Sequence, residues 1–234
     1  MRTPPPSDHP DPPRGDRRSD LKRQAILAAA TTTFLRRGYL GASMDEIAAL
    51  AAVSKQTVYK HFDDKEALFT EIVTSTVDRA SDPVYEIVLS LDPADDLPGA
   101  LRDLARRLLA TVMQPTVLQL RRLVIGEAGR FPELGRTFYE RGPQRTIAAL
   151  ADAFERLAGE GALRIEDPAL AAAHFNWLVM SIPLNEAMLC GDDEPPAPDE
   201  IDRYAEAGVD AFLAAYGPGA PGLGAASGAT RSTR

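Results

Sequence analysis

Residues 44–62 read MDEIAALAAVSKQTVYKHF and comprise two short helical runs joined by a turn of three or four residues. This spacing is typical of a helix-turn-helix, in which the second helix enters the major groove of DNA. No other stretch of the 234-residue chain carries a motif of comparable specificity. The motif predicts a DNA-binding function, against the alternative of an ordinary helical hairpin with two good caps.

Each helical run begins at a serine that suits the N-cap position. Ser43 stands three residues before Glu46, and this pair forms a capping box. Ser54 caps the second run in the same way. Val58 and Phe62, four residues apart, are expected to face inward and anchor the second helix. The polar residues beside them are then available to meet base edges and phosphates.

Helices are also predicted on both sides of the motif. Residues 21–37 carry apolar side chains at i, i+4 and i+8, namely Ile26, Ala30 and Phe34. A further helix begins after Asp64 and carries the apolar stripe Leu68, Phe69 and Ile72. Three helices around a small core, followed at once by a fourth, are the arrangement of a DNA-reading head.

The composition predicts an all-α protein of about nine helices, because alanine- and leucine-rich stretches dominate and strand patterns are hard to find. Cys190 is the only cysteine, which excludes a disulfide within the chain and favours a reducing compartment. No apolar run approaches the length of a membrane span, and the N-terminus is proline-rich rather than hydrophobic. We therefore expect a cytoplasmic protein without membrane contact.

The stretches FLRRGYLGASMDEIA (residues 34–48) and VSKQTVYKHFDDKEAL (residues 53–68) resemble the N-terminal head of the TetR/AcrR repressors. The similarity is dense over residues 26–69. The stretches QLRRLVIGEAGRFPELG (residues 119–135) and HFNWLVMSIPLNEAMLCG (residues 174–191) resemble the C-terminal domain of the AefR-like branch. The resemblance implies a helix-turn-helix head followed by a helical ligand-binding and dimerisation domain.

The resemblance also implies roles for individual residues. Those at positions that contact phosphates are Ser43, Thr57, Tyr59, His61 and Lys65, and Ser54 belongs to the same surface. Lys55 and Gln56 are the candidates for base edges, with lysine suited to guanine acceptors and glutamine to adenine. Lys60 is expected to meet either the DNA backbone or solvent.

Two residues depart from the family pattern. Ala52 occupies the turn where relatives usually have glycine, and a positive φ there would cost alanine about 1 kcal/mol. His61 replaces the commoner tyrosine, so its phosphate contact is expected to weaken as the imidazole loses its proton. Neither departure changes the expected fold.

Domain boundaries follow from composition and charge. We expect disordered tails over residues 1–18 and 217–234, a DNA-binding head over residues 19–79, and a helical regulatory and dimerisation domain over residues 80–216. Residues 1–64 hold 10 Lys and Arg against 8 Asp and Glu, while the remainder holds 16 against 26. A basic head on an acidic body suits a protein that places one end on polyphosphate.

The last two predicted helices, over residues 168–189 and 199–216, indicate a homodimer. One face of the first carries Ala171, Phe175, Leu178, Ile182 and Leu189. Its other face carries Leu170, His174, Trp177, Ser181 and Met188. A helix that is apolar on two faces is not a surface helix of a monomer, so both helices are expected to pack against their symmetry mates. Gly208 is expected to permit a close helix approach.

The resemblance implies a pocket for a small-molecule effector in the body. Its candidate residues are His174, Trp177, Ser181 and Asn185 on one helical face, with Phe138, Phe154 and Met180 as walls. The competing interpretation is a satisfied core, in which a buried histidine bonds a carbonyl and the tryptophan fills volume. Glu127 with Arg121, Arg122 or Arg130 would mark a charged ligand, but such pairs are usually surface or interhelical salt bridges.

The predicted function is a ligand-responsive transcriptional repressor that binds a palindromic DNA operator as a homodimer. An enzyme is the alternative from another class, but the chain shows no nucleophile–base pair of plausible spacing. The three histidines are scattered, so neither a metal site nor a cofactor is predicted. A constitutive DNA-binding protein with a filled body would differ only in lacking the cavity.

Overall fold

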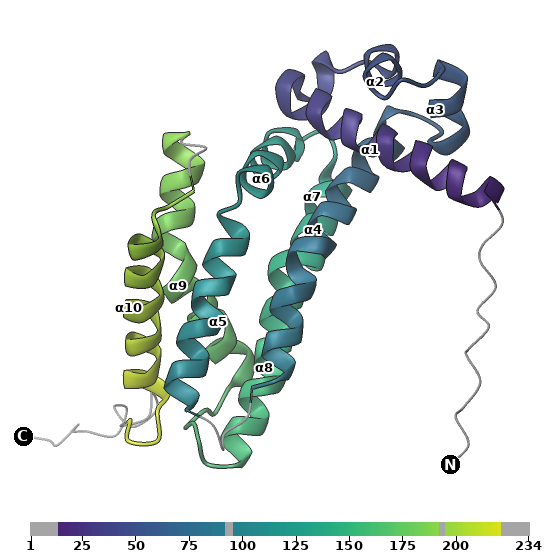
Figure 1. Cartoon of the computed structure of the whole chain (residues 1–234). Helices are drawn as coiled ribbons and strands as arrows, with labels where there is room; N and C mark the ends of the chain where they lie inside the picture. Colours follow the sequence, from purple (N-terminus) through teal and green to yellow (C-terminus); the bar gives the residue numbers. More distant parts are fainter. Residues whose placement is uncertain (1–13, 92–95, 192–194, 221–234) are drawn as a thin grey trace, which may run out of the picture. The chain divides into compact units, whose positions relative to one another are not determined.

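The computed structural model of the chain describes residues 14–91, 96–191 and 195–220, which form helices and no strands (Figure 1). The helices are α1 (Arg14–Gly41), α2 (Met44–Leu50), α3 (Lys55–His61), α4 (Lys65–Leu89), α5 (Leu97–Val112), α6 (Pro115–Glu127), α7 (Pro132–Tyr139), the π-helical turn η1 (Glu140–Gln144), α8 (Arg145–Gly159), α9 (Pro168–Cys190) and α10 (Pro198–Tyr216). Because α7, η1 and α8 form one unbroken run, these residues hold about nine helices. The all-α prediction is confirmed.

The chain divides into two compact units, one ending at Ile72 and the other beginning at Val73. The division falls within α4, whereas the sequence placed it between residues 79 and 80. The expected tails lie mainly outside the described residues. However, α1 already begins at Arg14, and Ala220 is buried and accepts a hydrogen bond from Arg164. The described parts of both expected tails are therefore ordered.

The first unit encloses the small core that the sequence predicted. The stripe of α1 is buried at Ile26, Ala30 and Phe34, and α4 contributes the buried Phe69. The rings of Phe34, Tyr39 and Phe69 gather with centroids 5.0 to 5.9 Å apart. This core holds α2 and α3 against α1, to which both are packed.

The second unit is built around α5, α8, α9 and α10. Phe154, Phe175 and Phe212 come from the last three of these helices and are fully buried, with ring centroids 5.0 to 5.7 Å apart. At Gly208, an added Cβ would lie 2.9 Å from Cγ2 of Val179, so glycine permits the close approach of α9 and α10. The predicted role of Gly208 is confirmed.

The predicted faces of α9 need a correction. Ala171 and Phe175 are buried as expected, but Leu178, Ile182 and Leu189 are exposed. The buried side instead continues through residues such as Val179 and Met180. Because nearly every side of this helix is apolar, the sequence pattern does not show which side faces the core.

The turn between α2 and α3 is closed by a Schellman motif. The Val53 N–H donates to the Ala48 carbonyl at 3.0 Å, and the Ala52 N–H donates to the Ala49 carbonyl at 3.2 Å. Ala52 therefore occupies the position that glycine usually fills, and its φ is 52°. It is the one non-glycine residue with a positive φ within the described ranges. The positive φ on which the expected cost to alanine depends is therefore present.

Replacing Ala52 by glycine is expected to raise the free energy of unfolding of the first unit. Glycine removes the steric strain of the left-handed conformation in the folded state, although it also raises the entropy of the unfolded chain. The first effect is larger, so the free energy of unfolding should rise by about 0.5–1 kcal/mol. Urea denaturation monitored by circular dichroism measures the change. Ala51→Gly is the matched control, because Ala51 is right-handed at φ −76° and should lose stability. Equal losses in both variants would contradict the strain at Ala52.

Candidate functional site

The helix α3 is fixed by its two ends and by its inner side. The Ser54 hydroxyl oxygen accepts the Thr57 N–H at 3.1 Å, which caps the first turn as predicted. Val58 is fully buried, and Phe62 is buried at the C-terminal end. Ser43 caps α2 in the same way by accepting the Glu46 N–H at 3.2 Å. The orientation of α3 within the first unit is therefore set by packing and capping together.

The opposite side of α3 is exposed and polar. Lys55, Gln56, Tyr59 and Lys60 are all exposed, with 43% of the Tyr59 surface accessible. His61 is half-buried at the end of the helix. These side chains leave the helix on the side away from Val58, so the first unit presents them to solvent. Such a surface offers cations, hydroxyls and one amide to a DNA duplex.

Lys55 already has a partner in the first unit. Its Nζ lies 2.8 Å from Oδ1 of Asp45 on α2. The hydrogen bond with Asp45 raises the pKa of the Lys55 ammonium, so this group stays charged. Both side chains are largely exposed, and exposed ion pairs are weak. Lys55 can therefore exchange this carboxylate for a phosphate oxygen or a guanine acceptor.

Lys65 was expected to contact a DNA phosphate, but in the structure it contacts other parts of the first unit. Its Nζ donates to the carbonyls of Tyr39 and Ala42 at 2.9 and 3.0 Å and lies 4.6 Å from the centre of the Tyr39 ring. These contacts tie the start of α4 to the last turn of α1 and to the residue that follows that helix. The ammonium keeps one further donor, so the structure gives Lys65 a positioning role first.

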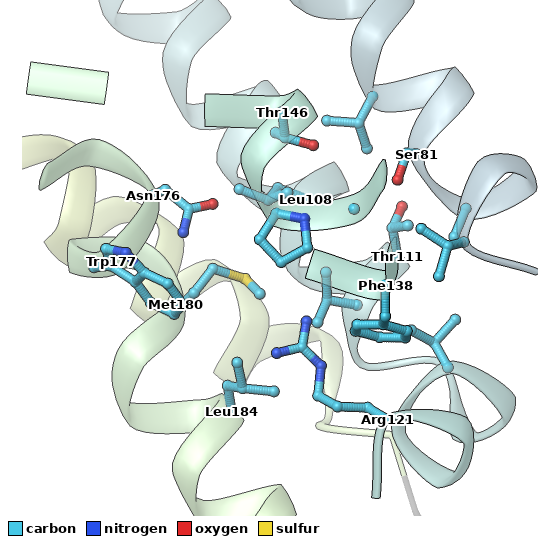
Figure 2. Close-up of a pocket in the computed structure, with 17 residues that line it drawn as sticks. Ser81, Leu108, Thr111, Arg121, Phe138, Thr146, Asn176, Trp177, Met180 and Leu184 are labelled. Atoms are coloured by element: carbon cyan, nitrogen blue, oxygen red, sulfur yellow. The ribbon is translucent and has the colours of Figure 1, made fainter. Parts of the chain in front are cut away.

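A cavity lies within the second unit among α4, α5, α6, α7, η1, α8 and α9 (Figure 2). It encloses about 580 Å³ of empty space, part of it open to solvent, and most of its walls are apolar. Gly142 and Pro143 of η1 form part of its wall. Proline removes a helical N–H, and π-helical turns of this kind are frequent at functional sites.

Three of the seven predicted ligand residues line this cavity, namely Phe138, Trp177 and Met180. The other four lie away from it, and contacts explain why. His174 Nδ1 pairs with the Tyr216 hydroxyl at 2.7 Å, and Phe154 is enclosed in the aromatic core. Ser181 and Asn185 are exposed on α9, where the Asn185 amide donates to the Ser181 carbonyl at 2.7 Å. The satisfied-core interpretation fits Phe154, whereas His174 has a hydrogen-bond partner but is exposed and is not a core residue.

Of the polar groups that do line the cavity, only Arg121 was considered from sequence, as one possible mark of a charged ligand, and it was not among the predicted ligand residues. These groups include Arg121, Thr146 and Asn176, of which the last two are buried. Burial lowers the pKa of the Arg121 guanidinium, although arginine remains protonated, and its Nε has no hydrogen-bond partner. The available signal was a charge between Val117 and Val124 on the buried stripe of α6.

Metal binding and membrane spanning each require a feature that the described ranges lack. No group of His, Cys, Asp and Glu side chains there could hold a metal ion. None of the helices described is both long and apolar enough to cross a membrane.

Two family models match the chain. Residues 26–72 match the model described as bacterial regulatory proteins of the tetR family. Residues 99–218 match the AefR-like transcriptional repressor C-terminal domain. The first match covers the helix-turn-helix, and the second covers most of the cavity walls. Both models describe transcriptional regulators and not enzymes.

Individual relatives agree with these models. One solved structure is that of a protein from Mesorhizobium loti MAFF303099 assigned to the TetR family of transcriptional regulators. Its sequence is 46% identical to this chain, and the two structures superpose with a TM-score of 0.79. The match covers 86% of this chain and 98% of the Mesorhizobium chain. The flavonoid-responsive regulator FrrA is 34% identical with a TM-score of 0.69, over 85% of this chain and 98% of its own. The uncharacterized regulator Rv1255c of Mycobacterium tuberculosis is 31% identical over 81% of this chain and 85% of its own. Several other curated regulators match over only 28–46% of their lengths.

Replacing Arg121 by methionine is expected to stabilise the second unit. The change removes a partly buried charge while keeping an apolar stem, and relief of desolvation outweighs the lost contact with Phe138 by about 1 kcal/mol. Chemical denaturation of purified variants measures the shift. Arg107→Met, at an exposed position of α5, should change stability little. A clear loss of stability in Arg121→Met alone would show that the charge is compensated.

Proposed function

Because the chain belongs to the TetR family of bacterial transcriptional regulators, we propose that it is a repressor that binds a palindromic operator as a homodimer and is released by a small-molecule effector. The observation that carries the proposal is the geometry of α3. Its inner side is anchored by Val58, and its polar side is exposed. A helix of this kind can enter the major groove without rearranging the core of the first unit.

The residues of this surface divide into two roles. Ser43, Ser54, Thr57, Tyr59, Lys60 and His61 hold the DNA backbone, and Lys65 supports them from the start of α4. Lys55 and Gln56, in the first turn of α3, read base edges. Phosphate contacts fix the register of the head on the duplex, and base contacts supply the sequence preference.

A second copy of the chain covers the exposed side of α9. This side carries Leu178, Ile182 and Leu189, which are exposed in the single chain. The neighbouring α10 exposes the small residues Ala207 and Ala211, which allow close helix packing. An isologous contact through α9 and α10 yields a two-fold dimer, whose heads meet half-sites about 34 Å apart.

The effector occupies the cavity of the second unit. Val77, Ser81 and Val84 of α4 line this cavity, and the same helix supplies Leu68 and Phe69 to the core of the first unit. A ligand that shifts α4 therefore acts on a helix that both units share. Near-complete release of DNA requires a differential affinity of about 5.5 kcal/mol between the two states. The cavity favours this regulated function over constitutive DNA binding.

Two substitutions on α3 test the division of roles. Tyr59→Ala is expected to weaken binding to all DNA sequences alike, by about 1 kcal/mol, because it removes a phosphate contact. Gln56→Ala is expected to relax the preference at particular base pairs, worth about 1–3 kcal/mol each. Fluorescence anisotropy with DNA from the protein's own promoter and with single-base variants measures both. Tyr139→Ala is the matched control, since Tyr139 is 50% exposed and lies on α7.

The same titrations are repeated over a range of salt concentrations. Affinity should fall steeply as salt rises, because phosphate contacts release counterions. Binding that does not depend on salt, or a uniform loss in both α3 variants, would contradict the assigned roles.

Ile182→Asp tests the dimer. Ile182 is 62% exposed in the single chain, so aspartate should leave the protomer folded while placing a charge in the interface. Light scattering should then give the 25.2 kDa mass of one chain instead of twice that mass. Ile125→Asp on α6, also 62% exposed, should remain dimeric. A dimer that survives Ile182→Asp would rule out this face.

A further inference from the structure

Arg121 is the cationic side chain that lines the cavity. Figure 2 shows its guanidinium directed from α6 into the space beside Phe138, Met180 and Leu184. Its guanidinium carbon lies 5.4 Å from the centre of the Phe138 ring. The rest of the wall is mainly apolar, with buried amide and hydroxyl groups at Asn176 and Thr146.

Arg121 differs from other arginines of the second unit. Arg141 and Arg145 each pair with a carboxylate on α4, at 2.7 Å from Asp78 and Asp82 respectively. Among the residues that the structure describes, no carboxylate forms an ion pair with Arg121, and its buried Nε has no hydrogen-bond partner. A partly buried charge without a counter-charge loses some of its hydration and gains no ion pair in return, so the site favours an incoming anion.

We infer that the effector is a compact aromatic anion whose carboxylate or phenolate binds Arg121 and whose ring packs against Phe138, Trp177 and Met180. This inference rests on the proposed function, because it names the chemical class of the ligand that occupies the same cavity. The guanidinium offers two parallel N–H donors to a carboxylate. Asn176 and Thr146 orient the polar end of the ligand, and the aromatic walls cover its ring.

The charge of the ligand decides its affinity. When an anion binds, the guanidinium takes the place of water molecules that hydrated the anion in solution. The anion at the same time supplies the counter-charge that Arg121 lacks. A neutral ligand of the same shape gains the apolar contacts but leaves that charge uncompensated. Since only the carboxylate adds an opposite charge and accepts two parallel N–H donors from the guanidinium, the anion should bind at least about tenfold more tightly.

The test compares hydrocinnamate with its neutral amide, hydrocinnamide, on the full-length protein without DNA. Trp177 is the only tryptophan of the chain and lines the cavity, so its emission reports occupancy without a label. Calorimetry gives the dissociation constants independently. Hydrocinnamate should bind at least about tenfold more tightly than the amide. Inorganic phosphate is the third ligand, and it should bind weakly because it has no ring for the apolar walls.

Three variants locate the preference. Arg121→Met should bind acid and amide alike, whereas Arg121→Lys keeps the charge and should retain a reduced preference. Arg107→Met, at its exposed position on α5, should behave as the unchanged protein. Equal affinities for acid and amide in the unchanged protein would overturn the inference. Binding of neither up to millimolar concentration, or a preference for the acid that survives in Arg121→Met, would also overturn it.

Experiments with the protein–DNA complex distinguish a failure of this inference from a failure of the proposed function. Adding hydrocinnamate to the protein–DNA complex should lower DNA affinity, and the amide should do so only at higher concentration. Acid binding through Arg121 without any effect on DNA would leave the anion site standing and contradict the ligand-responsive function. Release of DNA by acid and amide at equal concentrations would support the function and contradict the anion site.

Discussion

The orientation of the DNA-binding surface depends on the packing of Val58 in the core of the first unit. The side chain is fully enclosed, and the Ser54 cap fixes the first turn of the same helix. Together they leave α3 a single orientation in the first unit, with Gln56 and Tyr59 directed to solvent. Because the core supplies this orientation in advance, DNA binding requires little ordering of the helix and its cost in entropy is small.

Most of the head could be predicted from sequence, because its signals are local. Serine caps, the apolar spacing of α1 and the turn at Ala52 each depend on a few neighbouring residues, and all appear in the structure. Lys65 is the exception, since its two carbonyl partners lie on a distant segment of the chain. A resemblance to relatives indicates a role for such a residue but does not reveal its contacts.

The cavity was harder to predict, because its residues come together from seven helical elements. On α9, nearly every side is apolar, so the sequence could not distinguish Asn176 on the inner side from Asn185 on the exposed side. Arg121 carried a usable signal, a charge between two buried valines on one side of α6, but the absence of a counter-charge becomes visible only in three dimensions. The helix α4 lines the cavity and also contributes to the core of the first unit. This shared helix provides a physical route by which a ligand regulates DNA binding.

The central claim is that the polar side of α3 enters the major groove, and methylation interference tests it most directly. Genomic fragments that the protein selects would be methylated at guanine N7, which lies in the major groove, and sorted into bound and unbound fractions. The account predicts two clusters of interfering guanines, centred about 10 base pairs or a multiple of that apart. Binding that guanine N7 methylation leaves unchanged, with interference only from adenine N3 in the minor groove, would contradict it.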